Sequence, residues 1–115
     1  MVSIEDLYKE NIKVTNGNIL ATKLIEEMSE LTQMLCKALD GDIRFPNLAE
    51  EMADVEIMLT QVELMFMGMH PEFRREKEKV KSDKINRQIQ RIDALSSMRK
   101  ADESHSEAKT ILSQL

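Results

Sequence analysis

The sequence has few of the residues that interrupt helices and few of those that build sheets. It contains three glycines, two prolines, three phenylalanines, one tyrosine and no tryptophan. Strands favour aromatic and β-branched side chains, and the turns between strands need glycine and proline. Hydrophobic residues nevertheless make up 42% of the chain, nine of them methionine, which excludes a chain that is disordered throughout. We therefore expect an all-α fold.

The chain also lacks the features of secreted and membrane proteins. Its single cysteine, Cys36, has no partner for an intrachain disulfide, which is typical of a protein from a reducing compartment. No apolar run approaches the roughly 18 residues that a membrane helix needs, and no signal peptide is evident. A net charge of −5 argues against binding a nucleic-acid polymer and leaves small anions open. We expect a cytoplasmic protein with no membrane partner.

Apolar periodicity and capping residues predict four helices in one domain over residues 1–95. Ser3 would cap a short first helix; the next three would span about 19–39, 48–67 and 72–95, with Asn18 and Asn47 as caps and Pro71 at the start of the last. A polar tail, 96–115, would follow and either stay mobile or dock on a partner subunit through a final helical turn. The expected architecture is a four-to-five-helix bundle.

Two of these helices carry apolar stripes at helical spacing. The first stripe consists of Leu20, Leu24, Met28, Leu31, Leu35 and Leu39, and the second of Leu48, Met52, Val55, Leu59, Val62 and Phe66. The third helix has a second apolar side as well, so we expect it to be central or to contact another subunit. If the two stripes pack together, residues at equal offsets from them will meet.

Both stripes carry the same acidic pattern: leucine, any residue, two glutamates, methionine, a small residue, an acid and an aliphatic residue. In this pattern Glu27 and Glu30 lie about 60° and 120° to one side of Leu24, and Glu51 and Asp54 lie at the same offsets from Leu48. A single acidic pair on a helix is usually a solvated face. Two pairs at matched phase favour a shared site.

Four carboxylates around one small volume repel each other and remain ionised together only if a cation lies among them. Oxygen-only ligands suit Mg²⁺ or Mn²⁺ better than zinc. The fourth helix supplies a basic counterpart, because Lys84 and Arg87 are three residues apart and share a face. A lysine and an arginine together can hold phosphate oxygens, although a plain solvated helix is the alternative reading of this segment.

The combination of EExxE (Glu26, Glu27, Glu30) with ExxD (Glu51, Asp54) resembles the MazG-like all-α nucleoside triphosphate pyrophosphohydrolases, over about residues 18–92. The resemblance implies that Mg²⁺ is held by Glu27, Glu30, Glu51 and Asp54. Glu26 would support a ligand, hold a second metal or orient water, and Lys84 with Arg87 would contact phosphate. It also implies a homodimer or homotetramer.

The expected activity is hydrolysis of a (deoxy)nucleoside triphosphate to the monophosphate and pyrophosphate, with Mg²⁺ as the cofactor and Mn²⁺ as a substitute. Two alternatives remain open. One is a non-catalytic helical oligomer or regulatory relative of the family, and the other is a pyrophosphohydrolase for a specialised nucleotide. The chain has Leu20 where many relatives carry glutamine or tryptophan, and Ser82 where some carry asparagine. The sequence therefore does not predict the preferred base.

Overall fold

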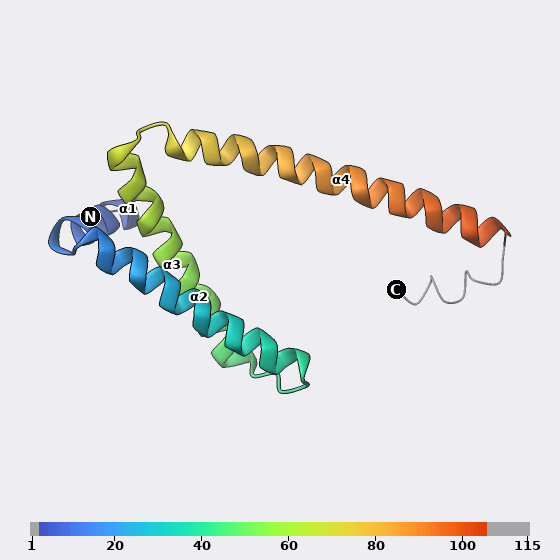
Figure 1. Cartoon of the computed structure of the whole chain (residues 1–115), viewed down its shortest axis with the longest axis horizontal. Helices are drawn as coiled ribbons and strands as arrows, with labels where there is room; N and C mark the ends of the chain where they lie inside the picture. The colour runs from blue at the N-terminus through green and yellow to red at the C-terminus, as the bar shows by residue number, and fades with distance from the viewer. Residues whose placement is uncertain (1–2, 106–115) are drawn as a thin grey trace. The chain divides into compact units, whose positions relative to one another are not determined.

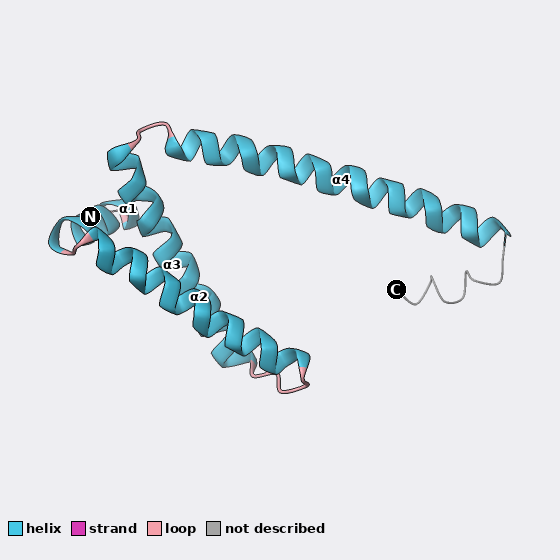
Figure 2. Ribbon diagram, viewed as in Figure 1, coloured by secondary structure: helices cyan, strands magenta, loops and turns pink. Residues whose placement is uncertain are grey.

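A computed structural model describes residues 3–105 of the chain and the side chains of residues 3–102. This part consists of four α-helices, α1 (Ile4–Val14), α2 (Gly17–Leu39), α3 (Phe45–Met69) and α4 (Phe73–His105), and contains no strand. Short turns join the helices (Figures 1 and 2). The all-α prediction is confirmed. The chain divides into two compact units, Met1–Arg74 and Arg75–Leu115.

Helix ends follow local chemistry, with three corrections to the predicted starts. The Ser3 cap is confirmed, since Asp6 N–H donates to Ser3 Oγ at 3.0 Å and Ser3 N–H donates to an Asp6 oxygen at 3.3 Å. The cap of α2 is Asn16 rather than Asn18, because the Asn16 side chain accepts from Asn18 N–H at 2.7 Å. The turn before α2 is therefore tighter than predicted.

The other two corrections concern proline. Helix α3 begins at Phe45, before the predicted cap Asn47, with Arg44 at the N-cap position and Pro46 in the first turn. Proline is tolerated there because the first N–H groups of a helix have no intrahelical partner. Pro71 was predicted to open α4, but it lies in a turn that Phe73 N–H closes on His70 O at 3.0 Å.

The turn after α2 is built as the sequence predicts. Gly41 has φ of 92°, in the left-handed region that glycine adopts without steric cost. Gly41 N–H donates to Ala38 O at 3.0 Å and Asp42 N–H donates to Lys37 O at 2.9 Å, so two terminal carbonyls of α2 are satisfied. This tight reversal lets α3 run back along α2, and the two helices lie side by side (Figure 1).

The core of the first unit lies between α2 and α3, where Leu20, Leu24 and Val62 are buried. Residues from α1 and α3 cover it, namely Ile12, Val55, Met58 and Met65. The space is tight near the start of α2, since a Cβ added at Gly17 would come within 2.8 Å of Met65 Sδ. Glycine at this position lets the first turn of α2 approach α3.

The buried seam differs from the predicted stripes at three positions on each helix. On α2 a line of buried or partly buried residues consists of Leu20, Leu24, Glu27, Leu31, Met34 and Ala38. On α3 the corresponding line consists of Leu48, Glu51, Val55, Met58, Val62 and Met65, and Gln61 and Leu64 beside it are buried as well. These lines keep the alternating three- and four-residue steps of packed helix pairs. The stripes also placed Leu35, Leu39, Leu59 and Phe66 inward, and all four are exposed. Met28 and Met52 were placed inward as well and are 42% and 49% exposed. Glutamates lie in the seam in their place.

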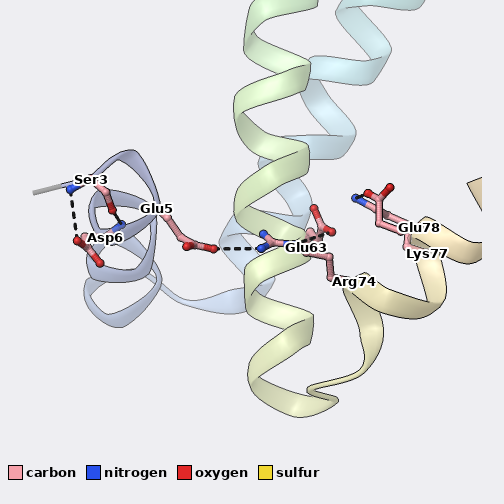
Figure 3. A network of polar contacts seen from close by, with 7 residues as sticks. All are labelled: Ser3, Glu5, Asp6, Glu63, Arg74, Lys77 and Glu78. Carbon is pink, nitrogen blue, oxygen red and sulfur yellow. Dashed lines mark hydrogen bonds and ion pairs between the residues drawn. The ribbon is translucent and has the colours of Figure 1, made fainter.

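Polar contacts attach α1 to α3. Asn11 donates a side-chain hydrogen bond to Gln61, whose side chain is buried. At the other end of α1, Arg74 reaches both Glu5, with Nη1 3.2 Å from Oε1, and Glu63, with Nε 3.3 Å from Oε1 (Figure 3). Arg74 therefore connects α1, α3 and the first turn of α4 within the first unit.

Helix α4 is longer than predicted and continues to His105, so the first half of the predicted tail is helical. Its central apolar residues, Ile85, Ile89, Ile92 and Leu95, are each about half exposed. Residues 106–115, including the apolar points predicted to dock on a partner, lie outside the described part of the chain. None of the helices within residues 3–105 has the length and apolar character that crossing a membrane requires.

Candidate metal centre

Three of the predicted ligands come together between α2 and α3. Glu27, Glu51 and Asp54 each offer a carboxylate oxygen, and these oxygens all lie within 4.8 Å of one another. Glu27 comes from α2, whereas Glu51 and Asp54 are one turn apart on the facing side of α3. The seam positions of Glu27 and Glu51 are what direct both carboxylates inward.

The group is enclosed to different degrees. Glu27 is 5% exposed, as buried as the apolar core residues of the same helix, while Glu51 and Asp54 are partly buried. Glu30 is exposed and does not belong to the group of three. Its carboxylate interacts with Glu51, because a hydrogen bond between the two side chains contributes to the pKa of Glu51. The fourth predicted ligand therefore lies at the edge of the cluster.

Burial and mutual repulsion control the protonation of Glu51. Its pKa is raised to about 7, first because the carboxyl group is desolvated, then through the hydrogen bond with Glu30 and the negative charges of Glu30, Glu27 and Asp54. Around neutral pH, the cluster without a cation therefore keeps a proton on Glu51 in part of the molecules. A cation bound by Glu51 would release this proton, because a carboxylate must be deprotonated to act as a ligand.

Glu27 behaves in the opposite way because it has a cationic neighbour. Lys23 Nζ lies 3.1 Å from Glu27 Oε1, and this hydrogen bond lowers the pKa of Glu27 against the opposing effect of burial. The ammonium of Lys23 thus favours the ionised form of Glu27. Lys23 was not singled out from the sequence, although its position one turn before Glu27 is the spacing at which lysine and glutamate pair on a helix.

The donor set fits a hard divalent cation. Oε2 of Glu27 and Oε2 of Glu51 are buried and have no hydrogen-bond partner. Buried polar atoms without partners are rare in folded proteins, and each needs an explanation such as an ion or water. A cation held by these oxygens and by Asp54 would satisfy both atoms. The all-oxygen environment suits Mg²⁺ or Mn²⁺.

The other predicted site residues lie outside this group. Glu26 is exposed, with an oxygen 4.0 Å from Lys23 Nζ. Lys84 and Arg87 are exposed on α4, one turn apart as predicted. They belong to the second compact unit, whose position relative to the first is not determined. Their contact with phosphate stays a prediction.

The cluster is built from side chains whose relation is visible in the sequence as a repeated acidic pattern. Which acidic residues belong to the cluster depends on which residues of each helix face the seam, and Glu27 and Glu51 lie in the seam itself.

Comparison of the chain with protein-family models, with curated proteins and with solved structures gives no match.

Proposed function

We propose that the protein is a Mg²⁺-dependent pyrophosphohydrolase that converts a (deoxy)nucleoside triphosphate into the monophosphate and pyrophosphate. The observation that carries the proposal is the pair of buried carboxylate oxygens without partners, on Glu27 and Glu51, within a three-carboxylate group. The same residues belong to the acidic pattern that resembles MazG-like enzymes.

The chain's own residues have distinct tasks in this reaction. Glu27, Glu51 and Asp54 would hold Mg²⁺, with Glu30 completing the set from the edge of the cluster. The bound ion would supply Lewis-acid polarisation of phosphate oxygens and favour ionisation of a water. Glu26 is exposed beside the cluster and is the candidate for orienting that water.

The balance of the reaction is simple. Water oxygen bonds to the α-phosphorus and a water proton passes to solvent. The bond from that phosphorus to the bridging oxygen breaks, and pyrophosphate leaves with the electron pair of that bond. Lys84 and Arg87 are the candidates for offsetting the charge that develops on the leaving group. Positioning and electrostatics are sufficient for this chemistry, which suits a small helical protein.

We also propose that the protein works as a homodimer or homotetramer. Apolar side chains remain exposed on the outer sides of α2 and α3, among them Ile25, Leu35, Met52 and Leu59. A monomer in water rarely leaves this many large apolar groups exposed along two adjacent helices. Association through these faces would enclose a substrate groove that a single chain leaves open.

The decisive test is release of pyrophosphate with Mg²⁺ and a panel of nucleoside and deoxynucleoside triphosphates. We expect turnover by the wild type and a loss of at least about a hundredfold in Glu27→Gln and Glu51→Gln, because each removes a metal-ligand charge. Glu50→Gln is the matched control, since Glu50 is adjacent to Glu51 and exposed; it should retain activity.

Other outcomes separate the alternatives. Hydrolysis of a phosphoribosyl or damaged nucleotide in place of the common triphosphates would identify a specialised enzyme. Absence of turnover on all of these, in a protein that still oligomerises, would identify a non-catalytic relative. Full activity in Glu27→Gln would show that the metal assignment is wrong.

A further inference from the structure

Lys23 lies at the boundary between the buried acidic cluster and solvent. Its Nζ is 3.1 Å from Glu27 Oε1 and 4.0 Å from Glu26 Oε2. The Lys23 side chain is 53% exposed, whereas that of Glu27 is 7% exposed. The charge of the most buried carboxylate is therefore compensated by an amine that reaches in from the surface.

The two oxygens of Glu27 have different surroundings. Oε1 accepts from Lys23, and Oε2 is buried without a partner. Lys23 thus fixes one side of the carboxylate and leaves the other available for a further ligand. A divalent cation at Oε2 would have the lysine ammonium as a close positive neighbour, and like charges at such separations repel.

The same helix offers a space into which the Lys23 side chain could move. Lys23 lines a cavity of about 240 Å³ together with Asn18, Ile19, Thr22 and Glu26. The cavity lies along the first turns of α2, and its lining includes an amide, a hydroxyl and the lysine itself. A lysine side chain is long and flexible, so it can leave Glu27 and lie along this open hollow with its ammonium in solvent.

We propose that Lys23 is an exchangeable counter-ion of the metal centre. Without a cation it neutralises and orients Glu27; when a divalent cation binds, Lys23 is displaced from Glu27 toward the cavity, where it meets the phosphates of the metal-bound nucleotide. Lys23 then acts as a positioning residue in both states. This inference rests on the proposed function, because it takes the acidic cluster to be a metal site.

The exchange predicts two effects of opposite sign. Removing the positive charge relieves repulsion at the metal centre, so Lys23→Gln should bind a divalent cation in the absence of nucleotide more tightly than the wild type, by roughly three- to tenfold after solvent screening. The same change removes a contact to phosphate, so KM for the nucleotide should rise while kcat changes less. Glutamine keeps a donor for Glu27, which limits any effect on folding.

The experiment titrates Mn²⁺ into the full-length protein without nucleotide at pH 8 and measures free Mn²⁺ by electron paramagnetic resonance. Lys23→Arg keeps the charge and should bind like the wild type. Lys37→Gln removes a lysine from the exposed end of the same helix and is the control for net charge. Circular dichroism confirms that each variant is helical.

Each result decides the matter. Tighter Mn²⁺ binding in Lys23→Gln than in the wild type and both controls supports the exchange. Equal or weaker binding in Lys23→Gln, with a wild type that binds Mn²⁺, overturns the exchange and leaves the metal centre standing. A wild type that binds no Mn²⁺ overturns the metal centre and the inference together.

Discussion

Two neighbouring parts of the α2–α3 seam follow the same spacing and bury opposite kinds of side chain. We call them the apolar end, near the start of α2, and the acidic end, around Glu27. At one end, Leu20 and Leu24 pack against Val62. One turn further along α2, Glu27 enters the same seam and meets Glu51 and Asp54 from α3. The difference teaches that the apolar end provides the stability with which the acidic end holds charges close together. The following predictions test this division.

The largest effect is expected at the apolar end. Leu24→Ala deletes a side chain that is 8% exposed and should lower the free energy of unfolding by about 2–4 kcal/mol, because it removes buried surface and leaves a cavity. Urea denaturation measures the change. The neighbouring Ile25 is 61% exposed, so Ile25→Ala should cost much less. Similar losses in both variants would mean that a second chain covers Ile25.

At the acidic end a substitution is expected to raise the stability rather than lower it. The pKa of Glu51 is raised from 4.5 to about 7 in the folded protein, so the folded state binds this proton more tightly than the unfolded state. In the metal-free protein this contribution to stability is fully present below pH 4.5 and is lost as the pH rises to about 7. Glu51→Gln should remove that loss and be more stable than the wild type at pH 8 in EDTA.

Urea denaturation at pH 5, 6, 7 and 8 measures this dependence, with Glu50→Gln as the control that keeps it. Glu27 works in the opposite direction, because its lowered pKa makes a contribution that is lost as the pH falls below 4.5. Added Mg²⁺ at ten times its Kd should stabilise the wild type by about 1.4 kcal/mol at pH 8 and should not stabilise Glu51→Gln to that extent. Identical pH profiles for wild type and Glu51→Gln would contradict the raised pKa of Glu51.

The smallest change in stability is expected for the surface ion pairs of Arg74, which lie outside both the apolar and the acidic end. Arg74→Ala removes the ion pairs with Glu5 and Glu63 and should cost about 0.5–1 kcal/mol, because Arg74 is 39% exposed and solvent screens the pairs. The loss should shrink in 1 M salt. Lys79→Ala, on the exposed surface of α4, serves as the control. An effect that does not respond to salt would indicate packing of the arginine stem instead.

Much of the fold follows from the sequence because local chemistry determines it. The Ser3 cap and the left-handed Gly41 depend on neighbouring residues alone, and both are confirmed. The start of α2 was misjudged because Asn16 and Asn18 lie two residues apart and either side chain can cap a helix. The start of α3 was misjudged because this helix begins without a side-chain cap, at Arg44 rather than at Asn47. Helix α4 was predicted too short because its polar continuation lacks apolar spacing, although it also lacks glycine and proline.

Part of the candidate site was also predicted from the sequence, because helical phase depends only on residue spacing. Helical phase placed Glu27, Glu51 and Asp54 beside the core, and the structure brings these three together. Phase alone did not show that the seam passes through Glu27 and Glu51 rather than Met28 and Met52, since that choice depends on how two helices interlock. For Lys84 and Arg87, helical phase predicts only that the two side chains share a face of α4.

The hydrogen bond between Asn11 and the buried Gln61 has a consequence for how α1 is mounted. Apolar surfaces tolerate sliding, whereas an amide pair with one buried member is satisfied at a single longitudinal position. Glu5 lies six residues before Asn11, about 9 Å along the helix axis, and must meet Arg74 at the same time. Two polar contacts at a fixed separation therefore favour one register of α1 along α3, which apolar packing alone would not select.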